Sequence, residues 1–251
     1  MDDVEEPLAG GNASQGVVRV GQTVRKPWTD ATPAVHRLMR HVRAVGVDVP
    51  AVLGRDERGR QVLEMVPGRL AMESPPLALD ELARVGRLVR TIHDAAQDLA
   101  WGSGARSDNV LPVAGADLVC HNDLAPWNLV LGPRWVFVDW DGAGPSTRLW
   151  DLAYAAQSFT VNDARADPVD AAAGLAALVE GYGADQALRD ALPTTLGRRA
   201  GAMLELLRSS HASGREPWGS MYTSGHGEHW HAATRYAKAH EETWRVALRG
   251  R

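Results

Sequence analysis

The sequence predicts an α+β protein with a small, β-rich N-terminal part and a larger, mainly helical C-terminal part. Three observations lead to this prediction. Residues 1–68 contain short apolar segments bounded by turn residues, as strands do. Pro67-Gly68 then interrupts the pattern. Beyond it, apolar residues recur at helical spacing over long stretches. We therefore expect one lobe at residues 1–68 and a second lobe at 69–251.

The N-terminal part is expected to form several strands and one helix. A tight turn at Gly21-Gln22 separates the first two strands. The helix should begin at Thr32-Pro33, because proline suits the first helical turn and apolar residues follow at helical spacing. The expected strands are 17–20, 23–26, 47–53 and 61–66.

The C-terminal part is expected to be helical except near its centre. Leu79 to Leu99 carries apolar residues along one helical face. Two short apolar runs, at 118–120 and 135–138, are candidate strands. Helical segments are expected again from Leu149 to the end of the chain.

The composition excludes several classes of protein. The chain has 251 residues, of which 45% are apolar and 23% charged, as in an ordinary soluble globular protein. Its net charge of −4 argues against a general nucleic-acid binder, and no apolar stretch is long enough to cross a membrane. The single cysteine, Cys120, excludes an internal disulfide and suits a reducing compartment. The N-terminus is acidic, unlike a secretory signal, so we expect a cytoplasmic protein.

One segment contains candidate catalytic and metal-binding residues. His121-Asn122-Asp123 and Asn128 form the pattern H-x-D-x-x-x-x-N after an apolar strand, and Asp139 ends the next strand. Phosphoryl transfer needs a carboxylate to accept or orient the proton of the attacking hydroxyl, and oxygen ligands to hold Mg²⁺. Asp123 fits the first role, and Asn128 and Asp139 fit the second.

Structural explanations also exist for these residues. His121 and Asp123 could stabilise a turn, and Asn128 could cap a helix. His121 is expected to hold the loop rather than to carry a proton. Asp151 is expected to be the N-cap of the helix that follows it, and therefore scaffold.

These motifs resemble the aminoglycoside phosphotransferase family of small-molecule kinases. The resemblance includes Val138-Asp139-Trp140-Asp141 and Trp150-Asp151-Leu152-Ala153, and it extends over about residues 8–155. It implies a bilobal protein-kinase-like fold and transfer of the γ-phosphoryl group of ATP, with GTP as an alternative donor. It also implies Mg²⁺ as cofactor.

The resemblance suggests where a nucleotide would bind. Gly10 to Gly16 could cradle phosphates, with Ser14 as a contact, although an ordinary hairpin turn would have the same composition. Residues 64–68 resemble the hinge whose backbone binds adenine, which points to Met65 and Val66. An apolar edge strand would look the same.

Strand alternation selects the phosphate-binding cation. Lys26 lies on the same face as Val24, which we expect to point inward, so Lys26 is preferred over Arg25. Lys26 could instead be a solvated residue at a strand end. The only other lysine, Lys238, lies in a polar helical stretch.

One feature departs from the kinase pattern. Kinases pair the strand lysine with a glutamate on the next helix, but the helix near residues 34–38 has none, and His36 stands near that position. The departure leaves the orientation of Lys26 open. It also motivates an alternative function, a catalytically inactive, nucleotide-binding regulatory module.

The acceptor is expected to be a hydroxyl of a small molecule. Only 12 residues separate Asp139 from Asp151, with no Ala-Pro-Glu, so a peptide-docking platform is not expected. Residues 69–251 carry the whole −4, which favours a cationic acceptor such as an aminoglycoside and would imply antibiotic resistance. Choline, amino alcohols, sugars and macrolides remain open, as does the oligomeric state. Candidate acceptor-binding residues are Glu205, Glu216, Glu228, Glu241, Glu242, Trp218 and Trp230.

A metal-dependent hydrolase is the rival enzyme class. It is suggested by the histidines of residues 226–231. The H-E-x-x-H pattern of zinc hydrolases is missing, so these histidines are expected to be solvated or to line a pocket.

Overall fold

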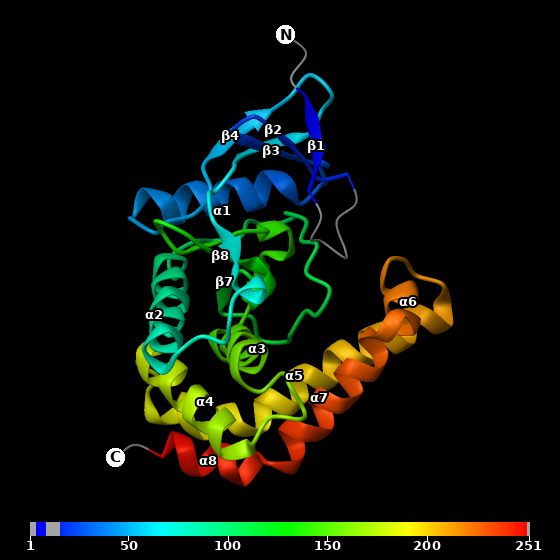
Figure 1. Ribbon diagram of the computed structural model, residues 1–251. Helices are drawn as coiled ribbons and strands as arrows, with labels where there is room; N and C mark the ends of the chain where they lie inside the picture. Colours follow the sequence, from blue (N-terminus) through cyan, green and yellow to red (C-terminus); the bar gives the residue numbers. More distant parts are fainter. Residues whose placement is uncertain (1–3, 9–15, 250–251) are drawn as a thin grey trace.

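The protein folds into two lobes, as a computed structural model that describes residues 4–8 and 16–249 shows (Figure 1). A five-stranded antiparallel sheet and helix α1 (Thr32–Ala44) form the small lobe at the top of the view. The sheet order is β1-β2-β3-β5-β4. Its strands are β1 (Glu5–Pro7), β2 (Val18–Val20), β3 (Thr23–Lys26), β4 (Val52–Arg55) and β5 (Gln61–Glu64).

Local sequence explains most of the small lobe. β2 and β3 pair around Gly21, whose φ of +59° suits glycine in a tight turn. Helix α1 has Pro33 in its first turn and buries one apolar face. The expected strand 47–53 is partly wrong, since β4 begins only at Val52. Val47 and Val49 are buried without entering the sheet.

The chain enters the large lobe through Pro67-Gly68. Gly68 has a φ of +148°, and a Cβ there would lie 2.4 Å from the carbonyl oxygen of Leu131, so only glycine fits. Short strands follow. A three-stranded sheet has the order β6-β8-β9, and β7 pairs with β10. Their bounds are β6 (Arg69–Leu70), β7 (Leu118–Cys120), β8 (Leu129–Leu131), β9 (Val136–Phe137) and β10 (Gly144–Ser146).

Helices make up the rest of the large lobe. Helices α5 and α7 run side by side across it, and α8 closes its lower end (Figure 1). None of the helices in the described ranges is both long and apolar enough to cross a membrane. The α-helices are α2 (Leu79–Ala95), α3 (Arg148–Thr160), α4 (Pro168–Tyr182), α5 (Gln186–Ser213), α6 (Trp218–Met221), α7 (Gly227–Ala239) and α8 (Glu241–Leu248). Single turns are η1 (Ala71–Glu73), η2 (Pro126–Asn128), η3 (Trp140–Gly142) and η4 (Tyr222–His226).

Helices α2 and α4 approach each other through two glycines. A Cβ on Gly86 would lie 2.0 Å from the carbonyl oxygen of Leu178, and one on Gly181 would lie 2.0 Å from that of Ala83. The two backbones therefore pack directly against each other. This close packing fixes the position of α2 against α4.

We predict that Gly86→Ala lowers the free energy of unfolding by about 1–3 kcal/mol or more, because the added methyl group overpacks a backbone contact. Gly201→Ala in α5 is the matched control. Its Cβ would meet Thr234 at an ordinary 3.6 Å, so the substitution should stabilise the helix by about 0.5–1 kcal/mol. Urea unfolding measures both, and equal effects would contradict the packing argument.

Candidate active site

Asp123 and Asn128 come together in the loop after β7. The Nδ2 of Asn128 donates to the Asp123 carboxylate at 2.7 Å and to its backbone carbonyl at 2.9 Å. Asn128 ends the η2 turn and is only 5% exposed. Because the amide nitrogen makes these bonds, the amide oxygen is the atom of Asn128 that can bind a cation.

Asp139 lies on the neighbouring strand end. The backbone N–H of Val138 donates to the Asn128 carbonyl at 2.8 Å, which places Asp139 next to the Asp123 loop. Asp139 has a φ of +59°, and Asn122 has one of +66°. They are the two non-glycine residues with positive φ in the described part of the chain. Such strained backbone often occurs at functional sites.

His121 joins the two strand ends, as expected for a structural residue. Burial lowers its pKa, so the ring is neutral. Its Nε2 lies 3.1 Å from the carbonyl oxygen of Val138 and donates to it. Its Nδ1 accepts the backbone N–H of Asp123 at 3.2 Å. One tautomer of the imidazole therefore binds both the loop that carries Asp123 and the strand end that precedes Asp139.

Asp151 binds the backbone of the loop that carries Asp123. Its carboxylate accepts the backbone N–H of Asn122 at 2.9 Å and contacts His93 at 3.1 Å. The expectation that Asp151 is an N-cap was wrong. Thr147 caps α3, accepting the N–H of Trp150, and Asp151 lies one turn further into the helix, where it is buried.

Lys26 reaches the site from β3. Its Nζ lies 2.5 Å from Asp139 Oδ1 and 2.5 Å from Asp141 Oδ2, and the residue is 5% exposed. Arg25 points the other way and pairs with Asp56. Strand alternation therefore predicted correctly that the side chain of Lys26, and not that of Arg25, points inward. Burial disfavours the ammonium, but the two carboxylates outweigh it and raise the pKa of Lys26 above its ordinary value.

The carboxylates of the site are perturbed in opposite directions. Burial and the nearby Asp139 raise the pKa of Asp123. Burial also acts on Asp139, but pairing with Lys26 outweighs it and lowers the pKa of that carboxyl. Asp123 is thus the better proton acceptor of the two near neutral pH, and Asp139 is the one held ionised.

Sequence reasoning missed two residues beside Asp123. Burial and the Asp123 carboxylate raise the pKa of Tyr154, whose ring stacks near Trp230. Arg199 of α5 is 3% exposed, lies 4.0 Å from the Tyr154 ring and donates to the Asn122 carbonyl at 3.4 Å. Neither belongs to a recognisable motif, because both enter from helices far along the chain.

The donor set fits a hard divalent cation. Asn128 offers an amide oxygen and Asp139 a carboxylate oxygen, which are the ligands that Mg²⁺ prefers. The Lys26 ammonium already lies between Asp139 and Asp141, so the position accepts positive charge. These residues therefore fit the expected metal.

The structure places the expected nucleotide contacts only in part. Ser14 and most of the glycine-rich segment lie outside the described residues. The N–H of Met65 donates to the Gln22 carbonyl, so a contact of Met65 with a base would use its carbonyl or side chain. The side chain of Val66 packs against Val130 and Val136.

The structure also shows the surroundings of the candidate histidines and glutamates of the C-terminal part. Of the residues that the structure describes, His93, Cys120 and Asp151 form the group close enough to hold a metal, so the 226–231 segment supports no zinc site. That group is fully buried, and His93 is bound to Tyr182 and Asp151. Glutamates 205, 241 and 242 contact Arg208, Thr194 and Arg245 on helices, Glu216 contacts Ser220 from the segment before α6, and Glu228 is exposed.

Comparison with known proteins gives a family match and a set of structural neighbours. Residues 104–191 match the family model of the phosphotransferase enzyme family, and this segment contains Asp123, Asn128, Asp139 and Asp151. No curated protein has a sequence that matches the chain.

Solved structures of small-molecule kinases share the fold. The microcompartment-associated aminopropanol kinase has a TM-score of 0.68 at 16% identity, over 98% of this chain and 95% of that chain. Amicoumacin kinase hAmiN, in complex with AMP-PNP, Ca²⁺ and Ami, has a TM-score of 0.65 at 12% identity, over 95% and 88%. A choline/ethanolamine kinase family protein from Mesorhizobium loti has a TM-score of 0.61 at 19% identity, over 99% and 93%.

These findings confirm the predicted fold and the family resemblance. The chain has the bilobal, protein-kinase-like α+β fold of the small-molecule kinases. At such low identities the structural neighbours establish the fold alone.

We predict that Asp151→Ala lowers the free energy of unfolding by about 2–5 kcal/mol, because it leaves His93 and the Asn122 N–H buried without an acceptor. Thermal or urea unfolding measures the loss. Asp163→Ala is the control, since Asp163 contacts Arg165 on the surface, and its effect should stay within about 0.5 kcal/mol. A similarly small effect at Asp151 would contradict its supporting role.

Proposed function

We propose that the protein transfers the γ-phosphoryl group of ATP to a hydroxyl of a small molecule. One observation carries the proposal: Lys26, Asp123, Asn128 and Asp139 meet where the two lobes join. They come from β3 and from the loops that follow β7 and β9. The fold and the family match at residues 104–191 support it.

Each residue then has a role that its surroundings favour. Asp123 accepts the proton of the attacking hydroxyl, and its raised pKa suits a base near neutral pH. Asn128 and Asp139 would hold Mg²⁺, which neutralises charge on the phosphates when it is bound. Lys26 would bind the phosphates as a fixed cation. We propose Ser14, Met65 and Val66 as further nucleotide contacts, with GTP as an alternative donor.

The surroundings of Asp123 favour an acceptor of low charge. The rings of Trp127, Tyr154 and Trp230 pack near it, and Arg199 is the buried cation beside it. Of the glutamates expected to bind a polycation, four already contact arginine, serine or threonine side chains. We therefore place amino alcohols and sugars ahead of aminoglycosides.

A protein acceptor is disfavoured by the segment after Asp139. Residues 140–146 form the η3 turn and β10, which pairs with β7, and α3 begins two residues later. The segment is thus folded back into the lobe rather than extended as a platform for a peptide. This favours a small-molecule acceptor.

The inactive regulatory module loses its main support. It was motivated by the glutamate missing from the helix near residues 34–38, but Lys26 is held by two carboxylates from elsewhere. The absent glutamate therefore does not leave the lysine without an acidic partner.

We also propose a cytoplasmic location and a lobe boundary between residues 68 and 69. The buried thiol of Cys120 suits a reducing compartment. The strands of the first sheet all end by Glu64, whereas β6 at Arg69 pairs within the second lobe.

The test is nucleotide-dependent phosphorylation across a panel of amino alcohols, sugars and aminoglycosides. We predict that Asp123→Asn lowers turnover by about 10²–10⁴-fold, since it removes the proton acceptor. The affinity for Mg²⁺-ATP, measured by calorimetry, should change little. Asp163→Asn, on the surface, is the control. Full turnover by Asp123→Asn would contradict the assignment of Asp123 as the proton acceptor. Wild-type protein that binds Mg²⁺-ATP but transfers no phosphoryl group to any acceptor would favour the regulatory module.

A further inference from the structure

We propose that Asp141 is a positioning residue that holds the Lys26 ammonium for the nucleotide phosphates. It does so through a buried relay of Gln61 and His36, which replaces the glutamate missing from α1. The inference rests on the proposed function and deepens it, because it assigns how the phosphate-binding cation is oriented.

The first step concerns the different partners of Asp139 and Asp141. Lys26 Nζ lies 2.5 Å from both Asp139 Oδ1 and Asp141 Oδ2. A divalent cation on Asp139 would compete with the ammonium for that carboxylate, because it carries twice the charge. Asp141 would then be the partner that Lys26 retains, and the ammonium would stay anchored when the metal is bound.

The second step is the amide of Gln61, which fixes Asp141. Gln61 faces Lys26 directly across the β3–β5 pair and is 2% exposed. Its Nε2 donates to Asp141 Oδ1 at 3.2 Å and to the Pro27 carbonyl at 3.1 Å. Both partners are acceptors, so the amide nitrogen must face them. One oxygen of Asp141 is thus held by Gln61 and the other by Lys26.

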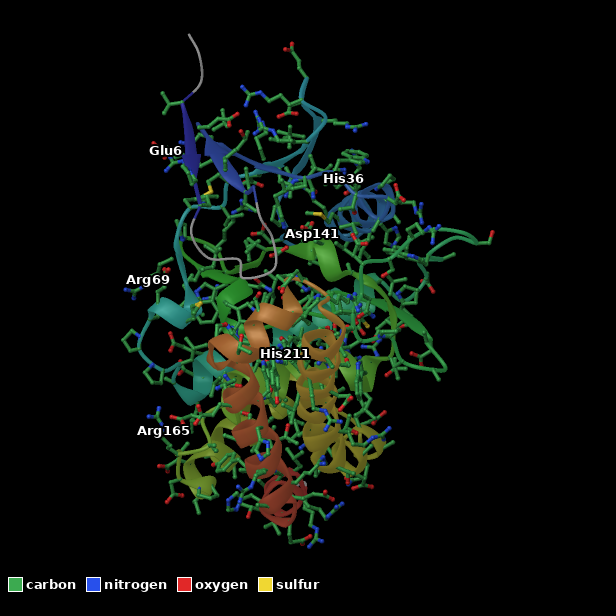
Figure 2. All side chains as sticks on the ribbon, turned by 90° about the vertical axis from the view of Figure 1, so that its right-hand side faces the viewer. Glu6, His36, Arg69, Asp141, Arg165 and His211 are labelled. Atoms are coloured by element: carbon green, nitrogen blue, oxygen red, sulfur yellow. The ribbon has the colours of Figure 1, made fainter. Side chains whose placement is uncertain are left out.

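The third step is His36, which fixes the amide from α1. Its Nε2 lies 3.1 Å from Gln61 Oε1, and since that oxygen only accepts, the imidazole donates. His36 is 2% exposed, and Trp28 packs edge-on against its ring at 5.4 Å. Figure 2 shows His36 on α1 and Asp141 below it, where the lobes meet. Helix α1 therefore reaches the lysine through His36, Gln61 and Asp141 instead of one glutamate.

The test is a double-mutant cycle on Mg²⁺-ATP affinity, measured by calorimetry without acceptor. Lys26→Met should weaken binding by about 10–100-fold, the scale of a hydrogen bond to a charged group. Asp141→Asn should weaken it by a smaller factor. In the Lys26→Met background, Asp141→Asn should change nothing further, because Asp141 acts through Lys26.

Matched controls isolate the effect. Lys238→Met removes the other lysine, which is exposed on α7, and Asp163→Asn removes a surface carboxylate. Neither should alter the affinity. Gln61→Met keeps the side-chain length and removes the bond to Asp141. Gln61→Met should weaken Mg²⁺-ATP binding in the wild-type background and have no effect in the Lys26→Met background. This comparison supplies the same test if Asp141→Asn does not fold.

The outcomes separate this inference from the proposed function. If the fold-losses of Mg²⁺-ATP affinity from Lys26→Met and Asp141→Asn multiply in the double mutant, the inference is overturned. Asp141 would then contact the metal or nucleotide on its own. Unchanged affinity in folded Asp141→Asn and Gln61→Met would also overturn it, with the proposed function intact. Wild-type protein that binds no Mg²⁺-ATP would overturn both.

Discussion

The pairing of Lys26 with Asp139 and Asp141 is the interaction on which the site depends. It joins β3 of the small lobe to the loop after β9 of the large lobe, across more than a hundred residues of sequence. A buried ammonium is stable only with such partners, and the cation in turn stabilises two half-buried carboxylates side by side. The lobes are therefore tied together at the position where a nucleotide and its metal would bring further charge.

The large lobe makes that position rigid. His121 binds the end of β9 and the Asp123 loop, and Asp151 holds the Asn122 backbone from helix α3. Asn122 in turn donates from its side chain to the carbonyl oxygens of Gly142 and Gly144. The proposed reacting groups thus lie on short loops whose backbone is fixed by polar side chains. Such preorganisation is what phosphoryl transfer, a reaction that depends on positioning, requires.

Much of the site could be predicted because its signals are local. The spacing of Asp123, Asn128 and Asp139 is a motif, and alternation along one strand distinguished Lys26 from Arg25. What failed depends on contacts between distant segments. Asp141, Gln61 and Arg199 gain their roles only when separate elements pack together. The N-cap prediction for Asp151 is wrong because the local preference for aspartate does not reveal that Thr147 caps α3.

The most direct measurement uses the fact that the chain contains only two lysines. Selective ¹⁵N labelling of lysine gives one side-chain ammonium signal from Lys26 and one from Lys238, which can be distinguished with Lys238→Met. On addition of Mg²⁺-ATP, we expect the Lys26 signal to shift, because Asp139 would bind the metal in place of the ammonium. The signal of the exposed Lys238 should stay unchanged. A Lys26 signal that does not move at saturating Mg²⁺-ATP would contradict the account.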